Sequence, residues 1–141
     1  MKYRFLEDKA IADICIEAFG KNYEELFVNS ALALTECMVR LKDVKPKIKE
    51  TIKFKNIKIE QLLYDFLSEL VYTKDVNQLL FVKYNMKIKQ GKKFELTCDC
   101  IGDKINMNTQ ELIADVKAIT MHMFKIEKTK NGFKATFVPD I

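Results

Sequence analysis

Three aspartates and the end of the chain have the chemistry of a divalent-cation site. Asp8 and Asp13 stand near the front of the 141-residue chain, and Asp140 precedes the last residue, Ile141. Mg²⁺ and Ca²⁺ prefer several oxygen ligands, which carboxylates supply together with negative charge. The α-carboxylate of Ile141 would add a further ligand. The alternative is structural: Asp8 would bond a loop backbone and Asp140 would lie on a frayed terminus.

The cysteines and the single histidine give weaker signals. Cys98 and Cys100 would face the same way on a strand, but Cys15 and Cys37 do not form the second pair that a zinc site needs. Small buried thiols are therefore the favoured interpretation. His122 would need a nucleophile and an orienting partner to act as a general base. The sequence identifies neither, so we expect a hydrogen-bonded strand histidine.

Lysines cluster in two regions of the chain. They could form a basic stripe for phosphates, or a solvated face that protects the edges of a sheet. No aromatic-rich RNA-binding signature accompanies them, and with only four glycines there is no phosphate-binding Gly-rich loop. These observations favour the solvated face. The lysines are Lys45, Lys47, Lys49, Lys53, Lys55 and Lys58, then Lys87, Lys89, Lys92 and Lys93.

Composition indicates an ordinary globular domain spanning residues 1–141. Hydrophobic residues make up 48% and charged residues 31% of the chain, and the net charge of +4 permits an RNA or acidic partner without requiring one. No apolar run approaches membrane-spanning length, so we expect no membrane contact. The start of the chain does not resemble a secretory or transit segment, which predicts a cytoplasmic protein with reduced thiols.

The first half of the chain must place Asp8 and Asp13. Residues 2–6 and 14–20 read as strands, the second by strict alternation, so that Asp8 falls in a loop and Asp13 at the start of a strand. Asn22, three residues before Glu25, has the spacing of a capping box and opens a predicted helix at 23–41. Pro46 cannot continue that helix. A half-exposed strand at 47–54 and a second helix at 59–70 follow.

The second half is predicted to be mostly strands. These are 79–90, 93–101, a central strand at 115–128 covered on both sides, and 133–138, which returns antiparallel after the turn signal at Asn131 and Gly132. The fold class is therefore α+β: two helices packed on one mostly antiparallel β-sheet, in a single two-layer domain.

Four segments resemble the archease family, in matching order and spacing over nearly the whole chain. They are Tyr3-Arg-Phe-Leu-Glu-Asp followed by Ala12-Asp13, the run Leu62-Leu63-Tyr64-Asp65-Phe66-Leu67-Ser68-Glu69-Leu70, the run Asp115-Val116-Lys117-Ala118-Ile119-Thr120, and Asp140-Ile141.

The resemblance implies a function that composition does not. Archeases are accessory proteins of RNA processing that help the GTP-dependent tRNA-splicing ligase of the RtcB type, promoting its guanylylation and repeated turnover. The resemblance also implies a calcium or magnesium site on Asp13 and Asp140. Many members carry His-Thr before Ala-Asp. This chain is two residues longer there and has Asp8 in the place of the histidine, which makes Asp8 a further candidate ligand beside the Ile141 carboxylate. Lys117 and His122 are assigned as partner-binding residues.

Three functions follow as hypotheses. The first is a non-enzymatic activator of the ligase that acts through an acidic, metal-binding tip. The second is a tRNA-binding module that presents tRNA to modifying or ligating enzymes, recognised by steep salt dependence. The third is a metal-dependent hydrolase that uses the same carboxylates. It ranks last because no base, nucleophile or phosphate loop can be named.

Overall fold

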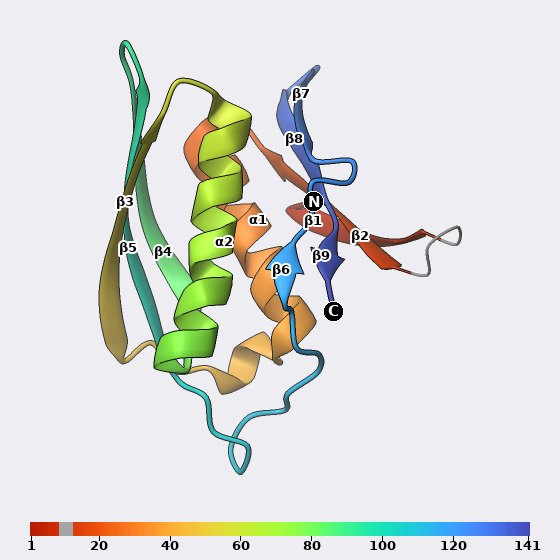
Figure 1. The fold of residues 1–141 in the computed structure, drawn as a ribbon, viewed down its shortest axis with the longest axis vertical. Helices are drawn as coiled ribbons and strands as arrows, with labels where there is room; N and C mark the ends of the chain where they lie inside the picture. Colours follow the sequence, from red (N-terminus) through yellow and green to blue (C-terminus); the bar gives the residue numbers. More distant parts are fainter. Residues whose placement is uncertain (9–12) are drawn as a thin grey trace.

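The computed structural model describes residues 1–8 and 13–141, and the side chains of Asp8 and Asp13 lie outside that description. Two long helices and a set of short to medium strands make up the fold (Figure 1). In chain order the elements are β1 (Tyr3–Asp8), β2 (Asp13–Gly20), α1 (Tyr23–Met38), a 3₁₀ turn (Leu41–Asp43), β3 (Ile48–Asn56), α2 (Ile59–Asn77), β4 (Leu79–Gln90), β5 (Phe94–Lys104), β6 (Ala118–Ile119), β7 (Lys125–Thr129), β8 (Gly132–Phe137) and β9 (Pro139–Asp140).

The strands pair into three antiparallel sheets. Their orders are β1-β2-β8-β7, β3-β5-β4 and β6-β9. In Figure 1 both helices lie between the two larger sheets, and α1 contacts β2 on one side and β4 on the other. The α+β class with two helices and antiparallel strands is confirmed. The expectation of one sheet is wrong, because the helices are apolar over a wide enough arc to be covered from two sides. Buried Ile16 and Phe137 line one sheet, and buried Ile52 and Leu96 line the other.

Elements whose signals are local agree with the sequence prediction. The side chain of Asn22 accepts a hydrogen bond from the backbone N–H of Glu25 at 2.8 Å and caps α1 as expected. The strand predicted at 79–90 has those bounds. The helix predicted at 59–70 continues to Asn77, and α1 ends three residues early, at Met38. The hairpin joins β7 to β8 as expected, although its two turn residues are Lys130 and Asn131.

The long central strand predicted at 115–128 is wrong. Only the short strands β6 and β7 form there, and the side chains of Met121 and Met123 are exposed rather than covered. Two local features interrupt pairing. Met123 adopts a left-handed backbone conformation with φ 57°, and the carbonyl of Val116 accepts a hydrogen bond from a lysine of α2 instead of a neighbouring strand.

A continuous apolar core fills the space between the sheets. Its largest fully buried side chains include Phe27, Phe66 and Phe137. All four cysteines are buried, as predicted, and the Sγ atoms of Cys98 and Cys100 lie 3.6 Å apart. Among the described residues, neither helix has the length and hydropathy needed to cross a membrane.

Candidate functional site

The β1–β2 hairpin sets Asp8 and Asp13 opposite each other. The ladder runs from the pair Tyr3–Ala18 to the pair Asp8–Asp13, which is its last row. β1 therefore extends two residues beyond its predicted end, and Asp8 belongs to a strand rather than to a loop. The backbone register thus brings the two early candidate ligands into one cross-strand row.

The last two strands of the chain also contact β2. β2 also pairs with β8, and that ladder ends at the pair Ile16–Phe137. Asp13 lies three residues before Ile16, and Asp140 lies three residues after Phe137, so both aspartates lie beyond the same end of this ladder. The chain then forms β9, which contacts β2 and lies between β6 and the hairpin in Figure 1. β9 therefore runs beside β2, while the outer end of the β1–β2 hairpin projects away from β9 (Figure 1).

Backbone hydrogen bonds hold Asp140 while leaving its side chain exposed. The N–H of Lys117 donates to the carbonyl oxygen of Asp140 at 2.7 Å, and Asp140 pairs with Ala118 across the β6–β9 ladder. Both the N–H and the hydroxyl of Thr120 donate to the carbonyl oxygen of Val138. A carboxylate on such a fixed backbone is available to a ligand.

The metal prediction concerns side chains that are only partly described. Among the described residues, no group of three or more His, Cys, Asp or Glu side chains is placed to hold a metal ion. The predicted set needs the Asp8 and Asp13 carboxylates, which lie outside the described side chains. Asp8, Asp13, Asp140 and Ile141 therefore remain predicted ligands.

Lys74 is a buried positioning residue that the sequence did not reveal. Its residue exposure is 6%, and its Nζ donates to Asp115 Oδ1 at 2.5 Å and to the carbonyl oxygen of Val116 at 2.7 Å. A further ion pair joins Nζ to Asp75 at 2.6 Å. Burial acts to lower the pKa of Lys74, but the two carboxylates outweigh it and raise that pKa. These bonds tie the segment that pairs with β9 to the last turn of α2.

The two predicted partner-binding residues lie on that segment and its continuation. Lys117 directly precedes β6, and His122 lies in the loop between β6 and β7; both are exposed. Met121 and Met123 flank His122 and are 63% and 46% exposed. The loop thus presents exposed apolar and ionisable side chains together. The partner-binding role of Lys117 and His122 stays a prediction.

The carboxylate of Glu17, on β2, already forms ion pairs with two basic side chains. Arg4 Nε lies 2.5 Å from Glu17 Oε1, and Lys134 Nζ lies 3.4 Å from Glu17 Oε2. Burial alone would raise the pKa of Glu17, but its bonds to Arg4 and Lys134 lower it. This carboxylate braces β1, β2 and β8 against one another rather than serving a metal.

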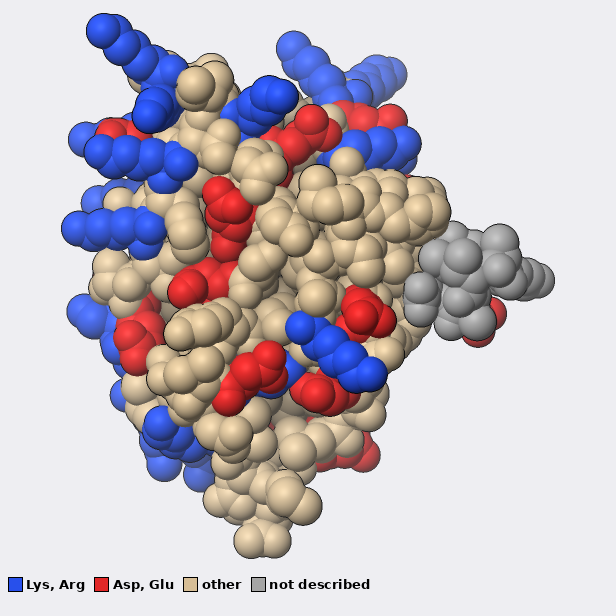
Figure 2. Space-filling model, in the orientation of Figure 1, with Lys and Arg blue, Asp and Glu red and all other residues tan. Residues whose placement is uncertain are grey.

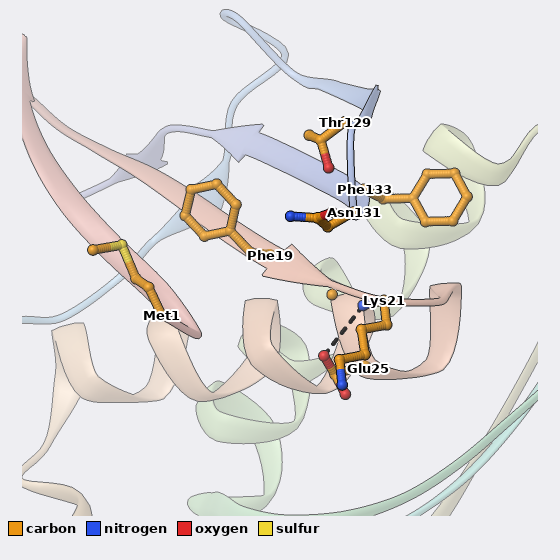
Figure 3. Close-up of a pocket in the computed structure, with 8 residues that line it drawn as sticks. Met1, Phe19, Lys21, Glu25, Thr129, Asn131 and Phe133 are labelled. Carbon is orange, nitrogen blue, oxygen red and sulfur yellow. Dashed lines mark hydrogen bonds between the residues drawn. The ribbon is translucent and has the colours of Figure 1, made fainter.

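A hollow of about 470 Å³ opens at the other end of β2 (Figure 3). Phe19 and Met1 contribute apolar walls, and the ring of Phe133 points away from Phe19 and stacks on Tyr23 at 4.4 Å between ring centroids. The N–H of Lys21 donates to Glu25 Oε1 at 3.2 Å. The hollow contains none of the predicted ligands and no second carboxylate beside Glu25, so it is not the predicted acidic site.

Comparison with known proteins identifies one family. The model of the archease protein family (MTH1598/TM1083) matches residues 3–141. The protein archease of Methanosarcina barkeri is 32% identical over 143 aligned residues, covering 99% of this chain and 96% of the relative. That of Pyrococcus furiosus is 38% identical over 132 residues, covering 92% and 93%.

Solved structures agree with the fold. The solution structure of protein 1598 from Methanobacterium thermoautotrophicum superposes with a TM-score of 0.86 at 31% identity, covering 99% of this chain and 98% of the other. A crystal structure from Thermotoga maritima, described as an archease and possible chaperone, has a TM-score of 0.64 at 21% identity, with coverage of 92% and 91%. The second likeness supports the fold alone.

Proposed function

This chain belongs to the archease family, and on that premise we propose that it is a non-enzymatic accessory protein of tRNA splicing. It acts in the cytoplasm on a GTP-dependent tRNA-splicing ligase, promoting guanylylation and repeated turnover. Its working part is an acidic tip formed by Asp8, Asp13, Asp140 and the terminal carboxylate of Ile141.

One observation carries the proposal. Asp8 and Asp13 form the last row of one ladder, and the end of β8 leads into β9 and Asp140 beside the same strand. Strands that lie more than 110 positions apart in the sequence therefore meet on β2, which supports a shared site for the aspartates that they carry.

The donor set suits a calcium or magnesium ion. All four candidate groups are hard oxygen donors, and the side chain of Asp140 is exposed on a backbone fixed by Lys117. A bound cation would supply positive charge for phosphate oxygens of the nucleotide or RNA. This chain's own residues fix the two chain ends relative to each other and present their carboxylates to the ligase.

The test is reconstituted ligation with purified ligase. We expect Asp13→Asn and Asp140→Asn each to reduce stimulation of multiple turnover by about tenfold or more, since losing even a supporting residue of a metal site costs about 10- to 100-fold. Glu111→Gln is the matched control, because it removes one exposed carboxylate from the loop after β5. Undiminished stimulation by both aspartate variants would refute the acidic tip.

The isolated protein provides a second measurement. A non-enzymatic accessory protein should leave RNA phosphodiester bonds and GTP intact in the presence of Mg²⁺ or Ca²⁺. Turnover that disappears in Asp13→Asn would instead identify the metal-dependent hydrolase of the third hypothesis.

A further inference from the structure

The β3-β5-β4 sheet has one face on the core and one face in solvent. Ile52, Leu96 and Cys98 are buried on the inner side. Because strand residues alternate between faces, their neighbours in sequence point outward. On β3 and β4 most of these outward residues are lysines.

The register aligns those lysines in cross-strand rows. Lys53 and Lys87 flank Thr97, Lys55 and Lys89 flank Glu95, and Lys49 and Lys83 flank Ile101. The lysines of β3 and β4 are thus separated by the width of β5, a distance of about 10 Å. From Lys49 to Lys55 the face extends for about 20 Å. We call Lys49, Lys53, Lys55, Lys83, Lys87 and Lys89 the basic face.

Little on the sheet neutralises this charge. Glu95 lies within these rows, and Asp99 lies in the neighbouring row between Thr51 and Asn85. Six lysines and two carboxylates give these four rows a net charge of +4, as large as that of the whole chain. Among the described residues, only Lys55 of the basic face forms an ion pair, with Glu95 at 3.2 Å. Thr51 donates to Asp99 at 2.8 Å. Figure 2 shows blue side chains projecting along the edge of the molecule where Figure 1 places this sheet.

The rows also border a shallow hollow. A space of about 670 Å³ is lined by lysines from both sides, Lys53 and Lys55 from β3 and Lys87 and Lys89 from β4. Glu95, Leu96 and Thr97 of β5 and Phe54 of β3 complete its lining. Two facing rows of flexible ammonium groups can contact phosphates on both sides of such a hollow.

We propose that the basic face binds the phosphate backbone of an RNA helix. Recognition of unpaired RNA relies on aromatic side chains that stack on bases. The outward residues of these rows include no aromatic ring, whereas the rings of Phe54 and Tyr84 belong to the inward-facing positions. Backbone contact with a helix uses lysines alone. The choice of RNA over DNA rests on the proposed function in tRNA splicing.

Fluorescence anisotropy with a labelled RNA hairpin tests the inference in the isolated, full-length protein. The test variant is Lys53→Gln with Lys87→Gln and Lys89→Gln. The control variant is Lys2→Gln with Lys128→Gln and Lys130→Gln, three exposed lysines in or next to strands of the β1-β2-β8-β7 sheet. Both variants lower the net charge equally, and circular dichroism checks that both remain folded.

We expect the wild type to bind with a steep salt dependence. The test variant should bind at least tenfold more weakly, and its log–log salt slope should be shallower by about 2 to 3, since each lost phosphate contact removes about 0.9 from the slope. The control should stay within a few-fold of wild type. Equal weakening in both variants would overturn the basic face as a site, as would an absence of binding by the wild type.

Three competitors complete the design. Duplex DNA of equal length that competes as well as RNA would overturn the assignment to RNA. If polyglutamate competes as strongly as RNA, the assignment to RNA is overturned in favour of an acidic protein partner. Single-stranded RNA that binds more tightly than the hairpin would overturn the assignment to a helix.

The two proposals can fail separately. Asp13→Asn with Asp140→Asn should bind the RNA hairpin like wild type, because β2 and β9 belong to the two sheets that do not carry the basic face. If the wild type stimulates the ligase but does not bind RNA, only the basic face is refuted. If it binds RNA through the basic face but does not stimulate the ligase, only the acidic tip is refuted.

Discussion

Lys74 Nζ and Asp115 Oδ1 lie 2.5 Å apart, although 41 residues separate them in the sequence. The lysine lies in the last turn of α2, and the aspartate begins the segment that leads to Lys117 and β6. The same ammonium group also donates to the carbonyl oxygen of Val116, a fully buried residue. A side chain of α2 therefore positions the strand against which Asp140 is held.

Removing this anchor should loosen the C-terminus. We expect Lys74→Met to lower the free energy of unfolding by about 1–3 kcal/mol, because the buried carbonyl of Val116 loses its donor. Amide exchange at Lys117, whose N–H bonds Asp140, should accelerate more than exchange within α1. Urea denaturation and hydrogen exchange measure the two effects, and exposed Lys128→Met is the control. Unchanged exchange at Lys117 would contradict the anchoring role.

The ion pairs of Glu17 predict an acid-sensitive contribution to stability. Arg4 and Lys134 lower the pKa of Glu17 against the opposing effect of burial. A lowered carboxyl pKa stabilises the fold above the unfolded value of about 4.3 and ceases to do so as pH falls through the folded value.

Glu17→Gln should therefore be less stable than wild type by about 1–3 kcal/mol at pH 7. The difference should shrink as pH falls below the unfolded value of about 4.3, and it should vanish once pH has fallen through the lowered pKa of Glu17 in the folded protein. Denaturant unfolding across this pH range provides the measurement. In the control Glu95→Gln, which removes an exposed pair with Lys55, the change should stay within about 1 kcal/mol. A Glu17 effect that is independent of pH would exclude the ionic explanation.

Much of the fold follows from interactions close in sequence. The Asn22 cap and the alternation of Leu79–Gln90 depend on neighbouring residues, and both elements are predicted correctly. The prediction of one strand at 115–128 fails because the alternation of these residues resembles a strand, whereas the residues that they actually contact are distant in sequence. Lys74 bonds the start of this segment, and nothing near Lys74 in sequence indicates a buried cation.

The candidate site shows the same division. The sequence alone identifies the carboxylates of Asp8, Asp13 and Asp140 as candidate ligands, but the pairing of their strands depends on two ladders that meet on β2. Strand alternation says which face a side chain occupies without saying which strand lies beside it. The lysines divide in the same way. Their exposure to solvent is predicted from the sequence, whereas the alignment of Lys53 with Lys87 on either side of Thr97 is known only from the register of β3, β5 and β4.

The buried thiols should resist modification in the folded protein. Burial, with a smaller effect of Glu36, raises the pKa of Cys37 to about 12. The pKa of Cys100 is raised by its hydrogen bond to Cys98 and by burial. Because these pKa values are raised, little of either thiol is ionised at pH 7 to 9, and the thiolate is the form that reacts.

A thiol-specific chromogenic reagent should consequently label the native protein very slowly and label all four cysteines in denaturant. The rate should follow the unfolded fraction as denaturant is added. Rapid native labelling of Cys98 or Cys100 would contradict their burial and reopen the possibility of a reactive or metal-binding pair.

Gly132, at the start of β8, should not tolerate a side chain. Its φ of +155° is one that L-residues rarely adopt, and a Cβ there would lie 2.2 Å from the carbonyl oxygen of Gly20. Gly132→Ala should lower the free energy of unfolding by about 2 kcal/mol or more, combining backbone strain with overpacking. Gly91→Ala is the matched control, since the nearest atom to a Cβ there is 3.8 Å away. Thermal and urea unfolding compare the two. Equal stability would show that the β7–β8 hairpin can move away from Gly20 at little cost, in which case this contact does not fix the register that leads to Asp140.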